Sequence, residues 1–109
     1  MRVLLDENLP RKLKHGIAAD ATTVPERGWA GTKNGALLKL AAANFDVMLT
    51  MDRGIEFQNS LQGLDLCVLV ISAPSNEIDT LIPLLPEIND AISSAEPGRI
   101  LRVGGSDPA

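Results

Sequence analysis

Two aspartates, Asp6 and Asp52, each follow a short apolar segment of the chain. Asp6 lies in "VLLDENLP" (3–10), and Asp52 lies in "VMLTMD" (47–52). If both segments form strands of one parallel sheet, the groups beyond their carboxyl ends share an edge, where ligands commonly bind. Neighbouring strands are about 4.8 Å apart, so the two carboxylates are expected to reach one divalent cation such as Mg²⁺. A bound cation would also relieve the repulsion between them.

Other charged residues extend this candidate site. Glu7 is a third ligand candidate, although neighbouring residues at a strand end usually point in different directions. Lys33 and Arg53 could bind a phosphate directly. Arg11 belongs to a basic segment, 11–15, that could orient a nucleic acid.

Most of the candidates also have a purely structural interpretation. Asp6, Asn8 and Asp52 precede predicted helices, where each would cap free N–H groups and contribute about 1 kcal/mol. For the two aspartates we favour the site, because both fall independently on the same edge. The single Trp29 could stack on a base, but a lone Trp in a loop more often closes the edge of a core. Arg53 could instead hold Asp52 in place.

Apolar runs and helical spacings alternate along the chain. The predicted strands are 2–5, 21–24, 46–49, 67–71 and 100–103, and the predicted helices are 9–15, 34–44, 55–61 and 77–94. Asn34 is expected to be the N-cap of the second helix rather than a ligand, even where it borders the site, and Ser75 or Asn76 the N-cap of the last. Pro83 and Pro86 must kink or divide that last helix.

This alternation predicts a single three-layer α/β domain. Its sheet should be mostly parallel, with four or five strands and helices on both faces. The domain is expected to cover residues 1–103, followed by a flexible tail, 104–109. A length of 109 residues suits one domain, and 45% hydrophobic residues with only 3% aromatics suit a core of aliphatic side chains.

Composition and charge restrict the function classes. Cys67 is the only cysteine, which favours a reducing cytoplasm. We expect no signal peptide and no membrane partner, because the longest apolar run, 67–71, is far too short to span a bilayer. Residues 1–53 carry eight Lys or Arg against six Asp or Glu, whereas 54–109 carry two against eight. A phosphate-bearing partner is therefore expected to meet the first half.

Three segments together resemble the small PIN-like proteins, a bacterial family of compact relatives of PIN-domain ribonucleases often grouped with toxin–antitoxin systems. They are "LLDENLP", "NGALLKLAAANFD" and "VMLTMDRGIEF", and the resemblance covers roughly residues 1–75. It implies that the first strand neighbours the "VMLT" strand and that acids bind Mg²⁺ or Mn²⁺ to cleave single-stranded RNA. By position, Asp6, Asp52 and Thr50 match the family's motif. The resemblance also suggests an antitoxin protein as a partner.

The chain departs from the family's pattern at the start of the middle helix. Many relatives carry an Asp-Glu pair there, whereas this chain has Asn34 and Gly35. An amide oxygen can coordinate Mg²⁺, but it brings no charge to dehydrate the ion or to acidify a bound water. Glu7 and Glu56 could supply the missing charge.

Three functions follow from these observations. The first is a metal-dependent endoribonuclease of the PIN-like type, with the toxin of a toxin–antitoxin pair as one form of it. The second is a catalytically degenerate PIN-like domain that binds RNA or a partner protein. The third, ranked last, is a receiver-like signalling domain, for which residues 100–109 lack the expected Lys. A homodimer is left open by the sequence.

Overall fold

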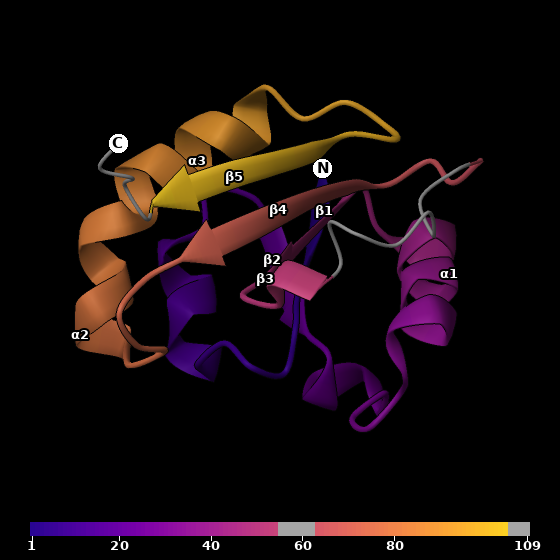
Figure 1. Cartoon of the computed structure of the whole chain (residues 1–109), viewed down its shortest axis with the longest axis horizontal. Coiled ribbons are helices and arrows are strands. Elements are labelled where there is room, and N and C mark those ends of the chain that lie inside the picture. The colour runs from indigo at the N-terminus through magenta and orange to yellow at the C-terminus, as the bar shows by residue number, and fades with distance from the viewer. Residues whose placement is uncertain (55–62, 105–109) are drawn as a thin grey trace.

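Five strands form one sheet in the computed structural model of this protein, which describes residues 1–54 and 63–104. The strands are β1 (Arg2–Leu5), β2 (Asp20–Thr23), β3 (Val47–Thr50), β4 (Cys67–Ser72) and β5 (Ile100–Gly104). All neighbours pair in parallel, in the order β2-β1-β3-β4-β5 (Figure 1). The predicted parallel sheet is confirmed. The predicted helix at 55–61, with Glu56, lies outside the described residues.

The inner strands consist of residues that suit a sheet covered on both faces. Residues 3–5 of β1, all of β3 and the first five residues of β4 are buried. Continuous aliphatic runs of this kind are typical of parallel strands with helices on either side. The edge strands β2 and β5 are partly exposed.

Helices cover both faces of the sheet (Figure 1). One face carries η1 (Arg11–Gly16), α2 (Ile78–Leu81), η5 (Ile82–Leu84) and α3 (Leu85–Ser93), and the other carries α1 (Asn34–Asn44), preceded by η2 (Pro25–Arg27). The helices contribute buried side chains to a core on each side: Leu13, Leu81 and Ile88 on one, and Leu37, Leu38 and Ala41 on the other. The three-layer arrangement therefore matches the predicted fold class.

Several local predictions were wrong in detail. The predicted helix at 9–15 is a six-residue 3₁₀ helix that begins after Pro10, whose carbonyl accepts from the N–H of Leu13 at 3.0 Å. The N-cap of α1 is Lys33 rather than Asn34, because the Lys33 carbonyl accepts the first helical bond, from Leu37, at 2.8 Å. Gly104, assigned to the tail, ends β5.

The last predicted helix is divided as its prolines require. It consists of α2, the 3₁₀ helix η5, which contains Pro83, and α3, whose first turn contains Pro86. Its N-cap is Glu77 rather than Ser75 or Asn76, and no side chain caps it. Ser75 instead accepts a bond from the Glu77 N–H at 3.2 Å through its hydroxyl.

The strand order places a topological switch point between β1 and β3. The chain leaves β1 toward β2 on one side, and β3 continues to β4 on the other. In doubly wound sheets, the crevice beyond the carboxyl ends of two such strands is the usual ligand site. Among the described residues, no helix is long and apolar enough to cross a membrane.

Candidate functional site at the β1–β3 edge

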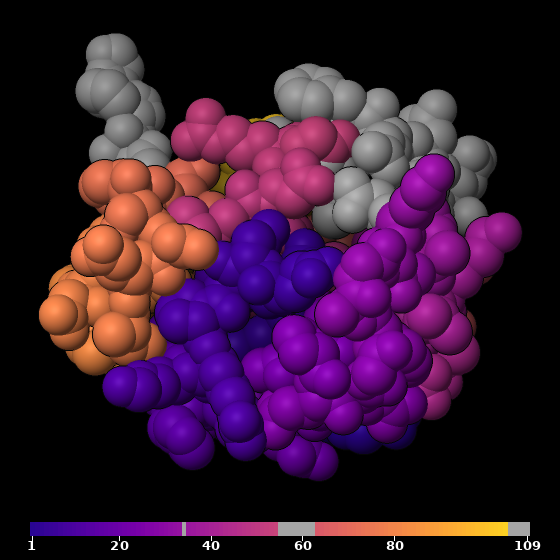
Figure 2. Space-filling view, turned by 90° about the horizontal axis from the view of Figure 1, so that it is seen from below, coloured from indigo at the N-terminus to yellow at the C-terminus, as the bar shows by residue number. Residues whose placement is uncertain are grey.

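The ends of β1 and β3 are direct neighbours. Leu5 pairs with Leu49, and the N–H of Asp6 donates to the Leu49 carbonyl at 2.9 Å. The strand adjacency that the sequence implied is therefore present, and no strand separates Asp6 from the segment that contains Thr50 and Asp52. Figure 2 shows the segment after β1, in indigo, beside the pink segment after β3.

The hydroxyl of Thr50 joins these two segments. It donates to Asp6 Oδ2 at 2.6 Å and accepts from the backbone N–H of Asp52 at 3.0 Å. The side-chain amide of Asn8 also donates to it, at 3.3 Å. Thr50 is fully buried, so its hydroxyl fixes the position of the Asp6 carboxylate from within the sheet.

Asp6 is a buried carboxylate, with 6% of the residue exposed. Its Oδ1 accepts from the Glu7 N–H at 2.8 Å, and its partners in the described part of the chain are neutral groups. Burial raises the pKa of Asp6 above its ordinary value, and the bonds from Thr50 and Glu7 offset part of that rise. The negative charges of Glu7 and Asp52 raise it further, which shows that three acids share this edge.

Asp52 also has a structural role. Its Oδ1 accepts from the Gly54 N–H at 2.8 Å, as in a turn closed by an aspartate side chain. Asp6 likewise accepts a bond from the next N–H along the chain. As a helix cap, however, Asp6 was wrongly predicted, because η1 has Pro10 as its N-cap and no side chain caps it. The helix that Asp52 was expected to cap, 55–61, lies outside the described residues.

Asn8 connects the edge to its surroundings. Its Oδ1 accepts from the Met51 N–H at 3.3 Å, and its backbone carbonyl accepts from the side chain of Asn76 at 3.1 Å. Asn8 therefore links the segment after β1 to the segment after β3 and to the loop before α2. Its contacts are those of a residue that positions the segments around it.

The remaining charged candidates surround the two aspartates. Glu7 is exposed, and its Oε1 accepts from the Gly31 N–H at 3.0 Å, which places its carboxylate against the loop before α1. Lys33 is exposed at the start of α1, and Asn34 is the first residue of that helix. Arg53 donates to the Ser72 hydroxyl at 3.1 Å, at the end of β4. All of them belong to segments at the carboxyl edge of the sheet.

Trp29 packs against the core. Its ring meets that of Phe45 edge to face at 6.1 Å, and the Arg27 guanidinium lies 4.6 Å from its centre. Phe45 follows the last residue of α1, and an eleven-residue helix is about 16 Å long. The Trp29 ring therefore lies toward the end of α1 that is remote from Lys33, where it closes the edge of the core.

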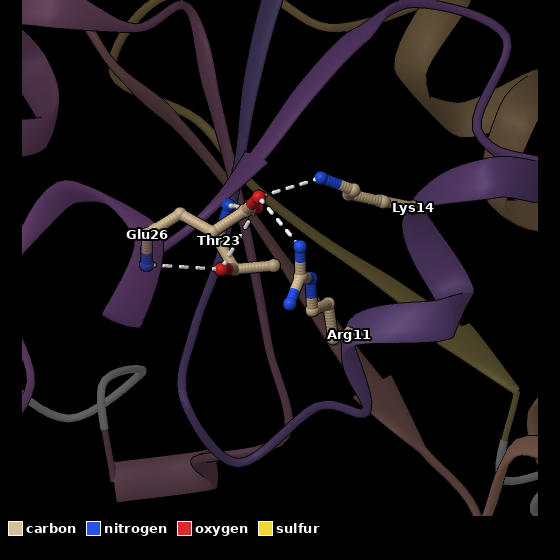
Figure 3. Close-up of polar contacts among 4 residues, drawn as sticks. All are labelled: Arg11, Lys14, Thr23 and Glu26. Atoms are coloured by element: carbon tan, nitrogen blue, oxygen red, sulfur yellow. Dashed lines mark hydrogen bonds and ion pairs between the residues drawn. The ribbon is translucent and has the colours of Figure 1, made fainter.

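Arg11 takes part in a cluster that the sequence interpretation missed. Glu26 accepts from Lys14 at 2.7 Å and forms a looser ion pair with Arg11 at 3.7 Å (Figure 3). Thr23 and Glu26 exchange the reciprocal bonds of a capping box. The bond from Lys14, followed by those from Thr23, lowers the pKa of Glu26 to about 2. A Thr followed three residues later by Glu was the available sequence signal.

The donor set at the edge suits one hydrated cation. Within residues 1–54 and 63–104, no group of three or more His, Cys, Asp or Glu side chains is arranged to hold a metal ion. Mg²⁺, however, is commonly bound through one or two carboxylates together with waters and substrate phosphates. Asp6 and Asp52 fit that smaller requirement.

Comparison with known proteins indicates no function for this chain, so a function can be proposed only from the geometry of the site. No protein-family model, curated protein or solved structure matches this chain.

Proposed function

We propose that the protein is a Mg²⁺- or Mn²⁺-dependent ribonuclease of the PIN-like type, acting on single-stranded RNA at the β1–β3 edge. The observation that carries the proposal is the buried Asp6 carboxylate at the switch point, with Asp52 close enough to raise its pKa. A carboxylate in this environment is stabilised by a cation. The resemblance of "LLDENLP" and "VMLTMDRGIEF" to the PIN-like proteins supplies the substrate class.

Each residue has a distinct role in this proposal. Asp6 and Asp52 hold the ion, which when bound polarises the phosphoryl oxygen and acidifies a water. Thr50 and Asn8 orient Asp6 through their hydrogen bonds. Lys33 binds the phosphates of RNA beside the edge, as does Arg53 on its other side.

Two acids imply a weak site. Each carboxylate contributes to dehydrating the ion, so a pair gives lower affinity than a larger cluster. The Glu7 carboxylate is directed at Gly31 in this structure, and Asn34 and Gly35 bring no charge to the start of α1. Metal binding in the millimolar range and slow cleavage are expected.

The same observation favours a second candidate, a catalytically degenerate PIN-like domain that binds RNA or a partner protein. In that function the bonds among Asp6, Asn8 and Thr50 hold the edge together without a cation. The two candidates differ in divalent-ion binding and in RNA cleavage, and both can be measured.

Cleavage of an end-labelled single-stranded RNA tests the proposal. The wild type should cleave with Mg²⁺ or Mn²⁺ and not with EDTA, and Asp6→Asn or Asp52→Asn should abolish cleavage. Asp46→Asn is the matched control, because Asp46 precedes β3 at the opposite edge and should leave the rate unchanged. Cleavage that survives Asp6→Asn rules out the mechanism. Calorimetry that finds RNA binding but no Mn²⁺ binding at millimolar concentration supports the second candidate.

A further inference from the structure

A pocket lies beside the β1–β3 edge, between η1, the end of β2 and η2. We call it the η1–η2 pocket; it is lined by Leu9, Arg11, Thr23, Pro25 and Glu26 and has a volume of about 380 Å³. Sites for small molecules have volumes of about 300–1,000 Å³, so this pocket has room for one small ring system. Figure 3 shows the polar residues of the pocket, Arg11, Thr23 and Glu26, together with Lys14, which like Arg11 points toward Glu26.

The pocket and the Asp6 site are adjacent. Thr23 pairs in register with Leu5, and the N–H of Val24 donates to the Leu5 carbonyl at 2.8 Å. Thr23 in the pocket is therefore about one strand spacing, 4.8 Å, from the end of β1 where Asp6 lies. A nucleotide whose phosphate lies at the β1–β3 edge can place a neighbouring base in the η1–η2 pocket.

The Glu26 carboxylate in the pocket has one acceptor position open to a ligand. A carboxylate has about four such positions. The Glu26 oxygens accept from the Thr23 N–H and hydroxyl, each at 3.0 Å, and from Lys14 at 2.7 Å. Arg11 lies 3.7 Å away, which is longer than a hydrogen bond, and 74% of its side chain is exposed. A ligand donor can therefore replace the loose Arg11 contact.

The charges and surfaces of the pocket select the ligand class. A carboxylate on the wall disfavours a phosphate inside the pocket, whereas a neutral ring with an N–H donor satisfies the open position. Leu9 and Pro25 provide apolar surface for the faces of such a ring. The exposed guanidinium of Arg11 can stack on it, as arginine does on unpaired bases.

We propose that the η1–η2 pocket binds an unpaired nucleobase carrying an exocyclic amino group, next to the phosphate held at the Asp6–Asp52 edge. This inference rests on the proposed function for its RNA substrate. It makes adenine, cytosine and guanine acceptable at this position and disfavours uracil, because the only free N–H of uracil, at N3, lies between two carbonyl oxygens that the Glu26 carboxylate repels. Base-paired RNA is excluded, because a stacked base cannot enter the pocket.

The first test uses short oligo(C) and oligo(U) of equal length, titrated into the protein by calorimetry in EDTA, where no cleavage occurs. Cytosine and uracil share a ring size, but cytosine presents an amino donor where uracil has a carbonyl oxygen, and the one N–H donor of uracil is flanked by two carbonyl oxygens. The wild type should bind oligo(C) about tenfold more tightly, as expected for a bond to a charged acceptor. Glu26→Gln should remove that preference. Equal affinity of the wild type for the two oligomers overturns the proposal.

The second test removes the stacking group and controls for its charge. Arg11→Ala should weaken binding of oligo(C) several-fold more than binding of a ribose-phosphate oligomer without bases. Lys12→Ala removes the same charge from the same 3₁₀ helix but faces a different groove, so it should weaken both ligands equally. If the two variants behave alike, the pocket does not bind a base. Circular dichroism verifies that each variant is folded.

The outcomes separate this inference from the nuclease proposal. Metal-dependent cleavage without base preference overturns the pocket proposal alone. Base preference in EDTA with no metal-dependent cleavage supports the pocket and overturns the nuclease. Absence of any RNA binding overturns the pocket proposal in every case.

Discussion

The Thr50 hydroxyl donates a 2.6 Å hydrogen bond to the Asp6 carboxylate, although the two residues lie 44 positions apart in the chain. The bond joins the ends of two neighbouring buried strands. It also brings the Asp6 carboxylate, which can only accept hydrogen bonds, together with the Thr50 hydroxyl, which both donates and accepts them, in one buried network. The position of Asp6 therefore depends on β3 as much as on its own strand.

Thr50→Val should destabilise the protein by about 1–3 kcal/mol, because it removes the hydroxyl that donates to Asp6 Oδ2 and accepts from the Asp52 N–H. Thr50→Ser keeps the hydroxyl and should retain more of the stability. Urea denaturation of both variants measures the difference. A loss for Ser that equals or exceeds the loss for Val would show that the methyl group contributes at least as much as the hydroxyl and would contradict this prediction.

Asp6 should make stability fall as the pH rises. Burial raises its pKa above the ordinary value of 3.8, so the folded protein binds this proton more tightly than the unfolded chain. The free energy of unfolding then declines as the pH increases from 3.8 through the raised pKa. Asp6→Asn removes this dependence, and its stability relative to the wild type should improve over that range. Parallel pH profiles of the two proteins would contradict the assignment.

Glu26 should titrate at about pH 2, because Lys14 and Thr23 stabilise its ionised form. Its contribution to stability is present above the ordinary pKa of 4.5 and is lost as the pH falls toward 2. Lys14→Met keeps the apolar stem and should move the midpoint upward toward 4.5. Carboxyl NMR chemical shifts measure both midpoints. An unchanged midpoint in Lys14→Met would assign the effect to Thr23.

Substitution by alanine should have opposite effects on the stability of the protein at Gly104 and at Gly35. Gly104 has a φ of +77°, and a Cβ there would collide with the Ser72 carbonyl oxygen, so Gly104→Ala should cost about 1–3 kcal/mol. A Cβ at Gly35 meets no atom within 4 Å in the first turn of α1, so Gly35→Ala should stabilise by about 0.5–1 kcal/mol. Thermal denaturation compares the two. The same sign for both would contradict the geometry.

Adding an acid at the start of α1 should strengthen metal binding. Gly35→Glu introduces a carboxylate near the edge, since the loop before α1 contacts Glu7 through Gly31. Mn²⁺ affinity measured by calorimetry should increase. Ala43→Glu adds the same charge near the other end of the helix and should leave the affinity unchanged. Equal effects would indicate a general electrostatic attraction rather than a site.

The sequence predicted the features that depend on local pattern. The runs at 3–5, 47–49 and 67–71 identified buried parallel strands, and this placed Asp6 and Asp52 at one edge. The bounds of α1, 34–44, were predicted as observed, and only its N-cap was off by one position, since the Lys33 carbonyl accepts the first helical bond.

Features that depend on distant contacts were not predictable in this way. The direction of Glu7 is decided by the N–H of Gly31, 24 residues later. The low pKa of Glu26 depends on Lys14, which precedes it by 12 residues and reaches it from η1. Periodicity carries no information about either pairing.

Among the described residues, the single Trp29 belongs to the core on the α1 side of the sheet. The fluorescence emission of Trp29 therefore reports the unfolding of the α1 side of the sheet and not that of the layer formed by η1, α2 and α3. Superimposable melting curves from emission and far-ultraviolet dichroism would mean that both layers separate from the sheet in one step. Curves that diverge would identify which layer detaches first.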